Sequence, residues 1–487
     1  MAKLSAVKNL LMNLPEIKGP EQKRLPFKEK LKWTLIVLVL FFILSNIELY
    51  GLGPNALEQF EFLAIILGAS FGSLLSLGIG PIVTASIVLQ LLNGSGLLKI
   101  DTTTHDGRVF FQGLQKVLAL FFIIFEALIY VFMGGLSPDP GLAPAVFRNV
   151  QLLLVAQLCL GGLIVLFMDE VINKWGFGSG ISLFIAAGVS SQVFIRAFSP
   201  LTQSGMLAFG TGQAPVGVVW VFFKSLTGGD PLNAMRALFS ILATIVVFGF
   251  AVYAQAMKVE IPLSFGRVRG HGIRWPLNFI YTSNIPVILV AALIANLQLW
   301  ARLLQGAVEK RELTMGILHW VSAHIFGQFS GNSPVSGLVK WVYSPNLLNE
   351  VFAAFTSGSF NWIALVQAGT FAIFMMGGAV VFSMFWVQTA GMDARSQAKQ
   401  IMSSGLQIPG FRRDERVLES ILKRYIFPLT IMGGLTVGFL AASADVIGAL
   451  TSGTGILLTV MIIYRLYEEI AQQHMMDMYP MLRKMMA

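Results

Sequence analysis

The feature that most restricts the fold is a helix-breaking stretch inside an apolar region. Residues 68–81 have the sequence GASFGSLLSLGIGP, with four glycines and a final proline that lacks a backbone donor and fixes its own φ. The apolar run that follows, residues 82–92, spans about 16 Å as a helix, whereas the hydrocarbon core of a bilayer is about 30 Å thick. A second short apolar segment, residues 60–67, precedes the break. These lengths predict a half-helix that crosses only part of a membrane.

Irregular backbone at membrane depth persists only where it is buried in protein or lines a cavity. The break is therefore either a kink in an otherwise ordinary spanning helix or a broken helix beside a pathway through the membrane. The stretch alone leaves both interpretations open.

The composition places the whole chain in a membrane. Of its 487 residues, 55% are hydrophobic and 12% are charged, and the mean hydropathy is +0.72. Soluble domains have about 25% charged residues. Long apolar runs predict the helical class of membrane protein. The one cysteine, Cys159, excludes an intrachain disulfide.

Apolar runs predict ten crossings, one of which is the half-helix. Their expected limits are 33–50, 82–92, 109–133, 146–168, 181–199, 236–257, 277–300, 362–388, 426–444 and 454–472. An even number puts both termini on one side. Lys and Arg accumulate in the loops of that side, with eight in residues 1–32, so we expect both termini in the cytoplasm. Residues 1–13 are expected to form an amphipathic helix at the membrane surface.

Four loops between the crossings are long. Two lie on the expected cytoplasmic side, 258–276 and 389–425, and both are basic. These charges either only fix the orientation of the chain or form a docking surface for a polyanion or an acidic partner. The expected external loops, 200–235 and 301–361, are interpreted as polar segments rich in Gly and Ser, which either cap an external opening or vary freely.

Few polar side chains fall inside the predicted crossings. Thr84 and Gln90 lie in the half-helix, Glu126 in the crossing at 109–133, and Asn296 in the crossing at 277–300. A carboxylate in lipid is costly, so Glu126 must face protein or water or be protonated. Each of these residues either marks a functional site or only joins helices by local hydrogen bonds.

No enzyme motif, cofactor-binding motif or metal-ligand set is present in the sequence, and we expect neither catalysis, cofactor nor metal. Ile79, Ile82 and Val83, which line the break, are aliphatic. A secondary transporter for a small solute needs polar groups converging at the midplane, so an aliphatic lining argues against that alternative. A membrane-embedded hydrolase, the other alternative, would need a nucleophile–base pair, and the sequence shows none.

Ordered motifs along nearly the whole chain now point to one family. They are 27–34 FKEKLKWT, 77–85 LGIGPIVTA, 90–92 QLL, 178–189 GSGISLFIAAGV, 259–263 VEIPL, 283–288 SNIPVI, 296–300 NLQLW, 410–412 GFR, 422–426 LKRYI and 453–458 GTGILL. In these motifs the sequence resembles the SecY family of channel-forming translocase subunits, in its archaeal and eukaryotic branch. The loops at 200–235 and 301–361 match that family only weakly.

The resemblance implies an all-α membrane fold of ten helices, in two inverted five-helix halves around an hourglass pore. The implied order is a cytoplasmic N-terminus (1–32), an N-terminal half (33–200), an external hinge (201–235), a C-terminal half (236–472) and a cytoplasmic tail (473–487). Residues 57–70 resemble a plug, including Phe60, Phe62, Leu63, Ile65 and Ile66. The pore constriction resembles a ring of six aliphatic residues: Ile79, Val83, Ile181, Ile185, Ile288 and Leu458.

The resemblance also implies a lateral gate and a set of partners. Thr84, Glu126 and Asn296 match the polar cluster of the gate. The basic loops resemble a ribosome-docking surface with Arg267, Arg269, Arg412 and Arg413. The implied function is passage of unfolded secretory chains across the cell membrane and sideways release of apolar segments into the lipid bilayer. Implied partners are signal sequences and nascent polypeptides, the ribosome, and small SecE-type (gamma) and beta-type membrane subunits.

The docking interpretation predicts the effect of a charge reversal. Replacing Arg412 and Arg413 together with Glu should weaken ribosome binding and flatten its salt dependence, because phosphate contacts give an affinity that falls with salt. Binding measured across a salt series tests this, with unchanged helical content as the control. Equal binding by wild type and variant at every salt concentration would reject a docking role for this pair.

Overall fold

The computed structural model describes residues 15–21, 25–53, 72–94, 97–98, 100, 104–132, 135–139, 141–202, 206–208, 213–265, 272–282, 285–310, 320–330, 333–358, 360–403, 406–407, 414–451 and 453–478. The predicted plug and the four arginines assigned to ribosome docking lie outside these residues, as does the amphipathic helix expected over 1–13.

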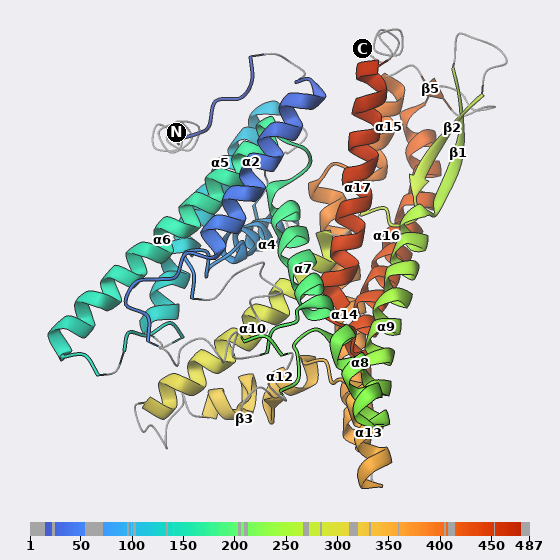
Figure 1. Cartoon of the computed structure of the whole chain (residues 1–487). Helices are drawn as coiled ribbons and strands as arrows, with labels where there is room; N and C mark the ends of the chain where they lie inside the picture. Colours follow the sequence, from blue (N-terminus) through green and yellow to red (C-terminus); the bar gives the residue numbers. More distant parts are fainter. Residues whose placement is uncertain are drawn as a thin grey trace.

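Ten long helices in the described part of the chain correspond one to one with the predicted crossings (Figure 1). The N-terminal half contains α2 (Phe27–Ser45), α4 (Gly80–Gly94), α5 (His105–Phe132), α6 (Pro144–Trp175) and α7 (Gly180–Phe198). The C-terminal half contains α9 (Pro231–Ala256), α10 (Ile285–Lys310), α14 (Trp362–Thr389), α16 (Glu415–Ile447) and α17 (Gly453–Met478). By length and composition alone, seven of the described helices can cross a membrane. By this criterion α4 is too short, and α2 and α17 do not qualify.

Helices of the two halves pack against each other in several places, and α2 contacts α17. Helix α7 packs against α17, and α4 packs against α10 and α14. Residues 15–21 and the end of α17 lie at the same end of the molecule (Figure 1), and Gln473 Nε2 of α17 donates to the Leu25 carbonyl at 2.9 Å. This end also carries a three-stranded sheet, whereas α8 (Val218–Gly228) and α13 (Leu347–Ser357) lie at the opposite end.

Several helices differ from the predicted crossings by five or more residues, and the structure explains three of these differences. Helix α2 ends at Ser45 instead of residue 50, because the chain then hydrogen bonds to the turn after the break, with the Leu49 N–H donating to the Gly72 carbonyl at 2.8 Å. Helix α10 begins at Ile285 instead of 277, because the preceding residues pair as strands. Helix α16 begins 11 residues before the predicted 426, where Asp414 accepts from the Arg416 N–H at 2.9 Å and caps the helix.

The loops at the end that carries the termini are structured. Strand β1 (Lys258–Phe265) pairs antiparallel with β2 (Gly272–Asn278) and with β5 (Leu406–Gln407). The pairing joins the two predicted basic loops into one unit, which α15 (Ala394–Ser403) extends. Tyr281 adds a further link, since its hydroxyl donates to the Met392 carbonyl at 2.7 Å. Burial and the nearby Asp393 raise the pKa of Tyr281 above its usual value, so the hydroxyl remains a donor.

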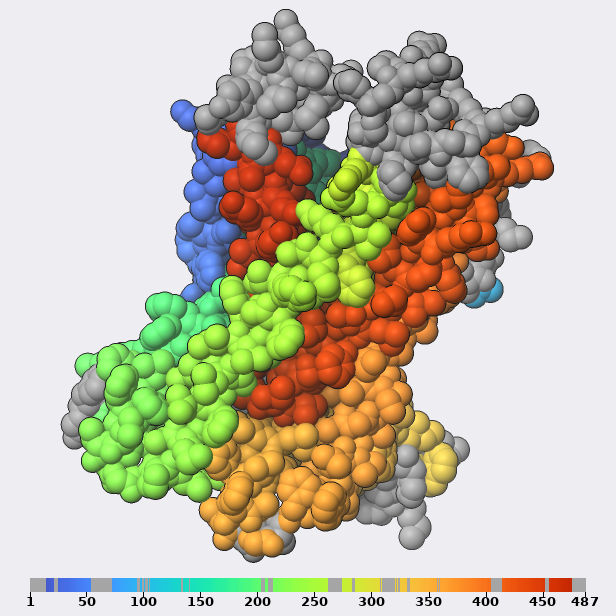
Figure 2. All heavy atoms as spheres, turned by 90° about the vertical axis from the view of Figure 1, so that its right-hand side faces the viewer, coloured from blue at the N-terminus to red at the C-terminus, as the bar shows by residue number. Residues whose placement is uncertain are grey.

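The interpretation of the external loops as polar was wrong for α8. Its sequence is VVWVFFKSLTG, and Trp220, Phe223 and Leu226 are exposed. Helix α8 packs against α9, and the two form a continuous surface in Figure 2. The other external loop folds into a π-helical turn (Val321–Phe326), the short strands β3 (Phe329–Ser330) and β4 (Ser333–Pro334), α12 (Gly337–Val342) and α13.

The helix break is built from successive tight turns. The N–H groups of Ser76, Gly78 and Gly80 each donate to the carbonyl three residues earlier, at 2.8–3.2 Å. Gly72 and Gly78 have φ of +86° and +53°, a region that disfavours side chains with a Cβ. Helix α4 then starts at Gly80 with Pro81 in its first turn, where a missing donor costs nothing. The predicted half-helix is therefore present, about 22 Å long.

Helix α6 supports the break through Gly161. A Cβ at this position would lie 1.9 Å from the Leu74 carbonyl oxygen, so only glycine lets the backbone of the turn rest on the helix. A Cβ at the neighbouring Gly162 would lie 2.8 Å from the side chain of Ile123 of α5. Small residues that permit such close backbone approach are typical of membrane helix interfaces.

This contact predicts a large effect of one added methyl group. Gly161→Ala should destabilise the protein by about 1–3 kcal/mol, as overpacking of a filled site does. Gly249→Ala in α9 is the matched control: nothing lies within 4 Å of a Cβ there, and removing a helix glycine should leave stability unchanged or raise it by about 0.5–1 kcal/mol. Thermal unfolding of the purified proteins measures both. Equal melting temperatures for the two variants would contradict the supporting role of Gly161.

Candidate functional site

The six residues predicted to form the constriction come from both halves of the molecule. Ile79 lies in the last turn before α4 and Val83 in α4, Ile181 and Ile185 in α7, Ile288 in α10 and Leu458 in α17. All six belong to one apolar core, in which five are at most 8% exposed and Ile181 is partly buried. All six therefore lie in the packed interior, and their role as a pore constriction stays a prediction.

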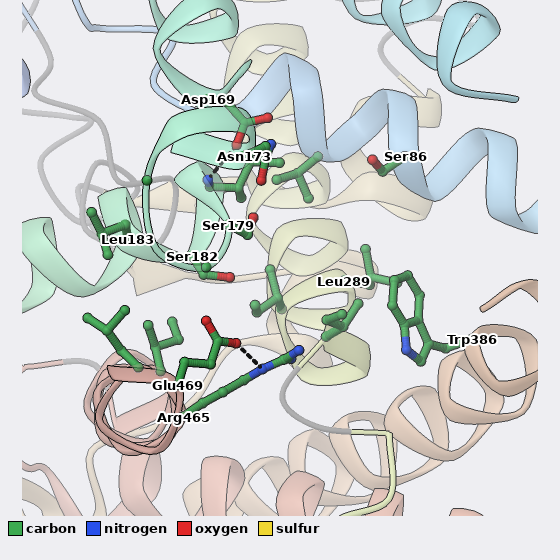
Figure 3. A pocket seen from close by; sticks show the side chains of 18 of the residues that line it. Ser86, Asp169, Asn173, Ser179, Ser182, Leu183, Leu289, Trp386, Arg465 and Glu469 are labelled. Carbon is green, nitrogen blue, oxygen red and sulfur yellow. Dashed lines mark hydrogen bonds and ion pairs between the residues drawn. The ribbon is translucent and has the colours of Figure 1, made fainter. Parts of the chain in front are cut away.

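A cavity of about 700 Å³ lies between helices of both halves, next to part of this set. Val83, Ile181 and Ile288 contribute its aliphatic lining. Its other walls are mixed. Polar side chains include Ser86, Asp169, Asn173, Ser179 and Ser182, and apolar ones include Leu183, Leu289 and Trp386 (Figure 3). Gln90, one of the predicted intramembrane polar residues, also lines this cavity.

One ion pair reaches into the cavity from α17. Arg465 Nε lies 3.4 Å from Glu469 Oε1, one helical turn away (Figure 3). Asp169 on the facing wall accepts from the Ile181 N–H at 2.9 Å and so caps the start of α7. Because Ile181 and Ile185 follow directly in that helix, Asp169 fixes the direction in which α7 presents them. Sequence analysis missed Asp169, since its partner lies across a turn between two helices.

Ile82 differs from its neighbour Val83. It lines a second cavity of about 340 Å³ between α4, α5 and α6, and does not line the first. Adjacent helical residues point about 100° apart, so only one of the pair can face the pore side.

The predicted polar cluster is assembled in the structure around Thr84. Asn296 Nδ2 of α10 donates to Thr84 Oγ1 at 3.2 Å, and Thr84 Oγ1 lies 3.4 Å from Glu126 Oε1 of α5. The same hydroxyl lies 2.9 Å from the Gly80 carbonyl, and its one proton can serve only one of these two acceptors at a time. Three membrane helices therefore meet at one hydroxyl group.

An apolar seam continues from the polar cluster between α5 and α10. Ala295, Leu299 and Leu303 of α10 pack in one buried cluster with residues of α5. The rings of Phe125 and Trp300 lie 5.9 Å apart across the same seam. Sequence analysis did not assign these two aromatic residues to the gate, because helical periodicity does not reveal which helices face each other.

Among the described residues, no group of three or more His, Cys, Asp or Glu side chains could hold a metal ion. The described residues combine a cavity with polar and apolar walls, buried aliphatic side chains from both halves, and a helix interface with a polar cluster at Thr84.

Comparison with known proteins identifies the family. The SecY family model matches residues 73–467, and the model of the plug domain of Sec61p matches residues 39–72. The chain belongs to the SecY family. It is 44% identical to the protein translocase subunit SecY of Methanothermobacter thermautotrophicus over 96% of each chain. It is 40% identical to that of Methanocaldococcus jannaschii over 98% of each.

Solved structures of SecY-type channels have the same fold. A structure described as a protein conducting channel is 39% identical, with a TM-score of 0.78 over 97% of this chain and 98% of the other. Sec61 in the canine ribosome–channel complex from the endoplasmic reticulum is also 39% identical, with a TM-score of 0.75 over the same shares. These matches confirm the predicted family, the ten-helix fold in two inverted halves, and the role as a channel subunit of a protein translocase. The chain is a multi-pass membrane protein.

Proposed function

We propose that this SecY-family chain passes unfolded polypeptides through its aliphatic ring and releases apolar segments through the seam between α5 and α10. The observation that carries the proposal is the position of α4. This half-helix contributes Val83 to the lining of the cavity and Thr84 to the polar cluster of the seam. One element therefore takes part in both the pore and the lateral exit.

The ring suits a substrate of variable sequence. Aliphatic side chains offer no hydrogen bond or charge, so they close around an extended chain without holding any particular residue. When no chain is present, a narrow apolar constriction opposes the passage of hydrated ions. The polar side chains that line part of the adjoining cavity contact the chain while it is still hydrated.

The polar cluster closes the seam weakly. Hydrogen bonds between membrane helices contribute about 0.6 kcal/mol on average and at most about 1.7 kcal/mol. Burial of one leucine side chain is worth about 1.5–3 kcal/mol relative to water. A few apolar residues in a signal sequence are therefore sufficient to replace the contacts of Thr84, Glu126 and Asn296.

We propose that the chain performs no catalysis itself and that a partner supplies the energy for translocation. A transporter for a small solute, the alternative from another class, is disfavoured by the aliphatic residues at the junction of the halves.

The plug at 57–70 is proposed to close the pore from the external side. The family model of the plug domain of Sec61p, which matches residues 39–72, supports this proposal.

The proposed partners are inferred from those of the relatives. The canine relative is part of a ribosome–channel complex, and we propose ribosome docking through Arg267, Arg269, Arg412 and Arg413. The pairing of β1 with β5 supports a joint surface, because it connects the two loops that carry these arginines. Small SecE-type and beta-type subunits are proposed to accompany the chain. The basic loops support an orientation in the cell membrane in which both termini are cytoplasmic.

The gate proposal predicts a shift in sorting. Asn296→Leu removes the hydrogen bond to Thr84 and should change the hydrophobicity at which a test segment leaves sideways into lipid. The expected change corresponds to about 0.6 kcal/mol, the mean strength of such a contact. Passage of a fully polar chain should remain nearly unchanged. A graded series of Leu/Ala segments, scored for membrane insertion, measures the shift.

Ser383→Ala is the matched control for this experiment. Ser383 Oγ lies 3.2 Å from Thr282 Oγ1, in a buried contact inside the C-terminal half and away from the seam. This variant loses a comparable hydrogen bond and should keep the wild-type threshold. An identical threshold in Asn296→Leu and wild type, with normal expression, would mean that Asn296 only joins helices. If the wild-type protein did not sort the series at all, the proposed function itself would fail.

A further inference from the structure

Residues 15–18, here called the strap, lie against α5 at Lys116 and against the end of α6. Lys116 Nζ of α5 donates to the Pro15 carbonyl at 2.6 Å. From α6, Lys174 Nζ donates to the Ile17 carbonyl at 2.6 Å and Trp175 Nε1 to the Lys18 carbonyl at 3.0 Å. The strap is therefore held by side chains of two helices that are about 100 to 160 residues away in sequence.

Glu170 of α6 lies at the centre of this contact. Its Oε1 forms an ion pair with Lys116 Nζ at 2.9 Å, and its Oε2 accepts from the Ile17 N–H at 3.2 Å. The side chains of Lys116 and Glu170 are only 15% and 17% exposed. Because Lys116 contacts both the strap and Glu170, it connects α5 to the strap and to α6.

The neighbouring residue extends the connection to α4. Gln115 Nε2 donates to Ser86 Oγ at 2.5 Å. Side chains thus connect α4, α5 and α6 at this level of the N-terminal half. Glu126, in the polar cluster of the seam, lies ten residues beyond Lys116 along α5, or about 15 Å.

We propose that Lys116 is a positioning residue for lateral release, and that its ion pair with Glu170, supported by its bond to the strap, fixes α5 to α6. In consequence α4, α5 and α6 separate from α10 as one body, and α5 does not swing out alone. The contact of Lys116 with Glu170 thereby raises the hydrophobicity that a segment needs in order to leave. This inference rests on the proposed lateral exit between α5 and α10.

The test uses the full chain in its translocase complex and the graded Leu/Ala series. Lys116→Met keeps the length of the side chain but removes the ion pair and the bond to the strap. It should lower the insertion threshold and raise the ratio of inserted to translocated segment about two- to fivefold, the range of a modest ion pair. Lys116→Arg should restore the wild-type threshold, since the charge again reaches Glu170.

Lys174→Met is the matched control. Lys174 contacts Glu170 and, in the strap, Glu16 and Ile17. It belongs to α6, and these bonds do not reach α5. This variant should keep the wild-type threshold, because the pair of Lys116 and Glu170 remains. Glu170→Gln removes that pair from the other side and should shift the threshold in the same direction as Lys116→Met.

Three results would overturn the inference. One is a wild-type threshold in both Lys116→Met and Glu170→Gln, and another is an equal shift in Lys174→Met. The third is a threshold in Lys116→Arg that differs from wild type although this variant has normal thermal stability. A purely structural role for Lys116 would lower the melting temperature without moving the threshold. If the wild-type protein sorts the series, the proposed function stands even when one of these results overturns the inference about Lys116.

Discussion

Backbone groups at membrane depth must be hydrogen bonded within the protein, and this requirement governs the region from Gly72 to Gly80. The turns there satisfy donors from Ser76, Gly78 and Gly80 internally, and the Leu49 N–H donates to the carbonyl of Gly72. Gly161 of α6 provides the flat surface on which the turns rest. With these bonds in place, the chain can stop one apolar segment and start a half-helix inside the membrane.

The half-helix α4 then determines the relation between pore and seam. Val83 faces the cavity, Thr84 holds the polar cluster, and Ser86 accepts from Gln115 of α5. Since successive residues point about 100° apart, one short helix reaches the pore, the seam and its own half of the molecule. A displacement of α4 relative to α10 therefore changes the constriction and the lateral contact together. This coupling suits a channel that must choose between passage and sideways release.

Much of this arrangement could be predicted from the sequence, because it depends on local patterns. Glycine and proline mark the break, apolar runs mark the ten crossings, and the family resemblance names Thr84, Glu126 and Asn296, which the structure brings together. What could not be predicted depends on contacts between distant segments. The pairing of β1 with β5, the ring contact between Phe125 and Trp300, and the strap on Lys116 leave no periodic signal. Helix α8 was missed because its apolar run is too short to indicate a crossing.

The central claim is that a translocating chain passes between the aliphatic residues of the two halves. The most direct measurement is photo-cross-linking from single positions of this protein to a polypeptide stalled during passage. A probe at Val83, Ile185 or Ile288 should cross-link to the stalled chain, and one at Ile82, which lines the second cavity, should not. Equal cross-linking from Ile82 and Val83, or none from any of the three ring positions, would contradict the account.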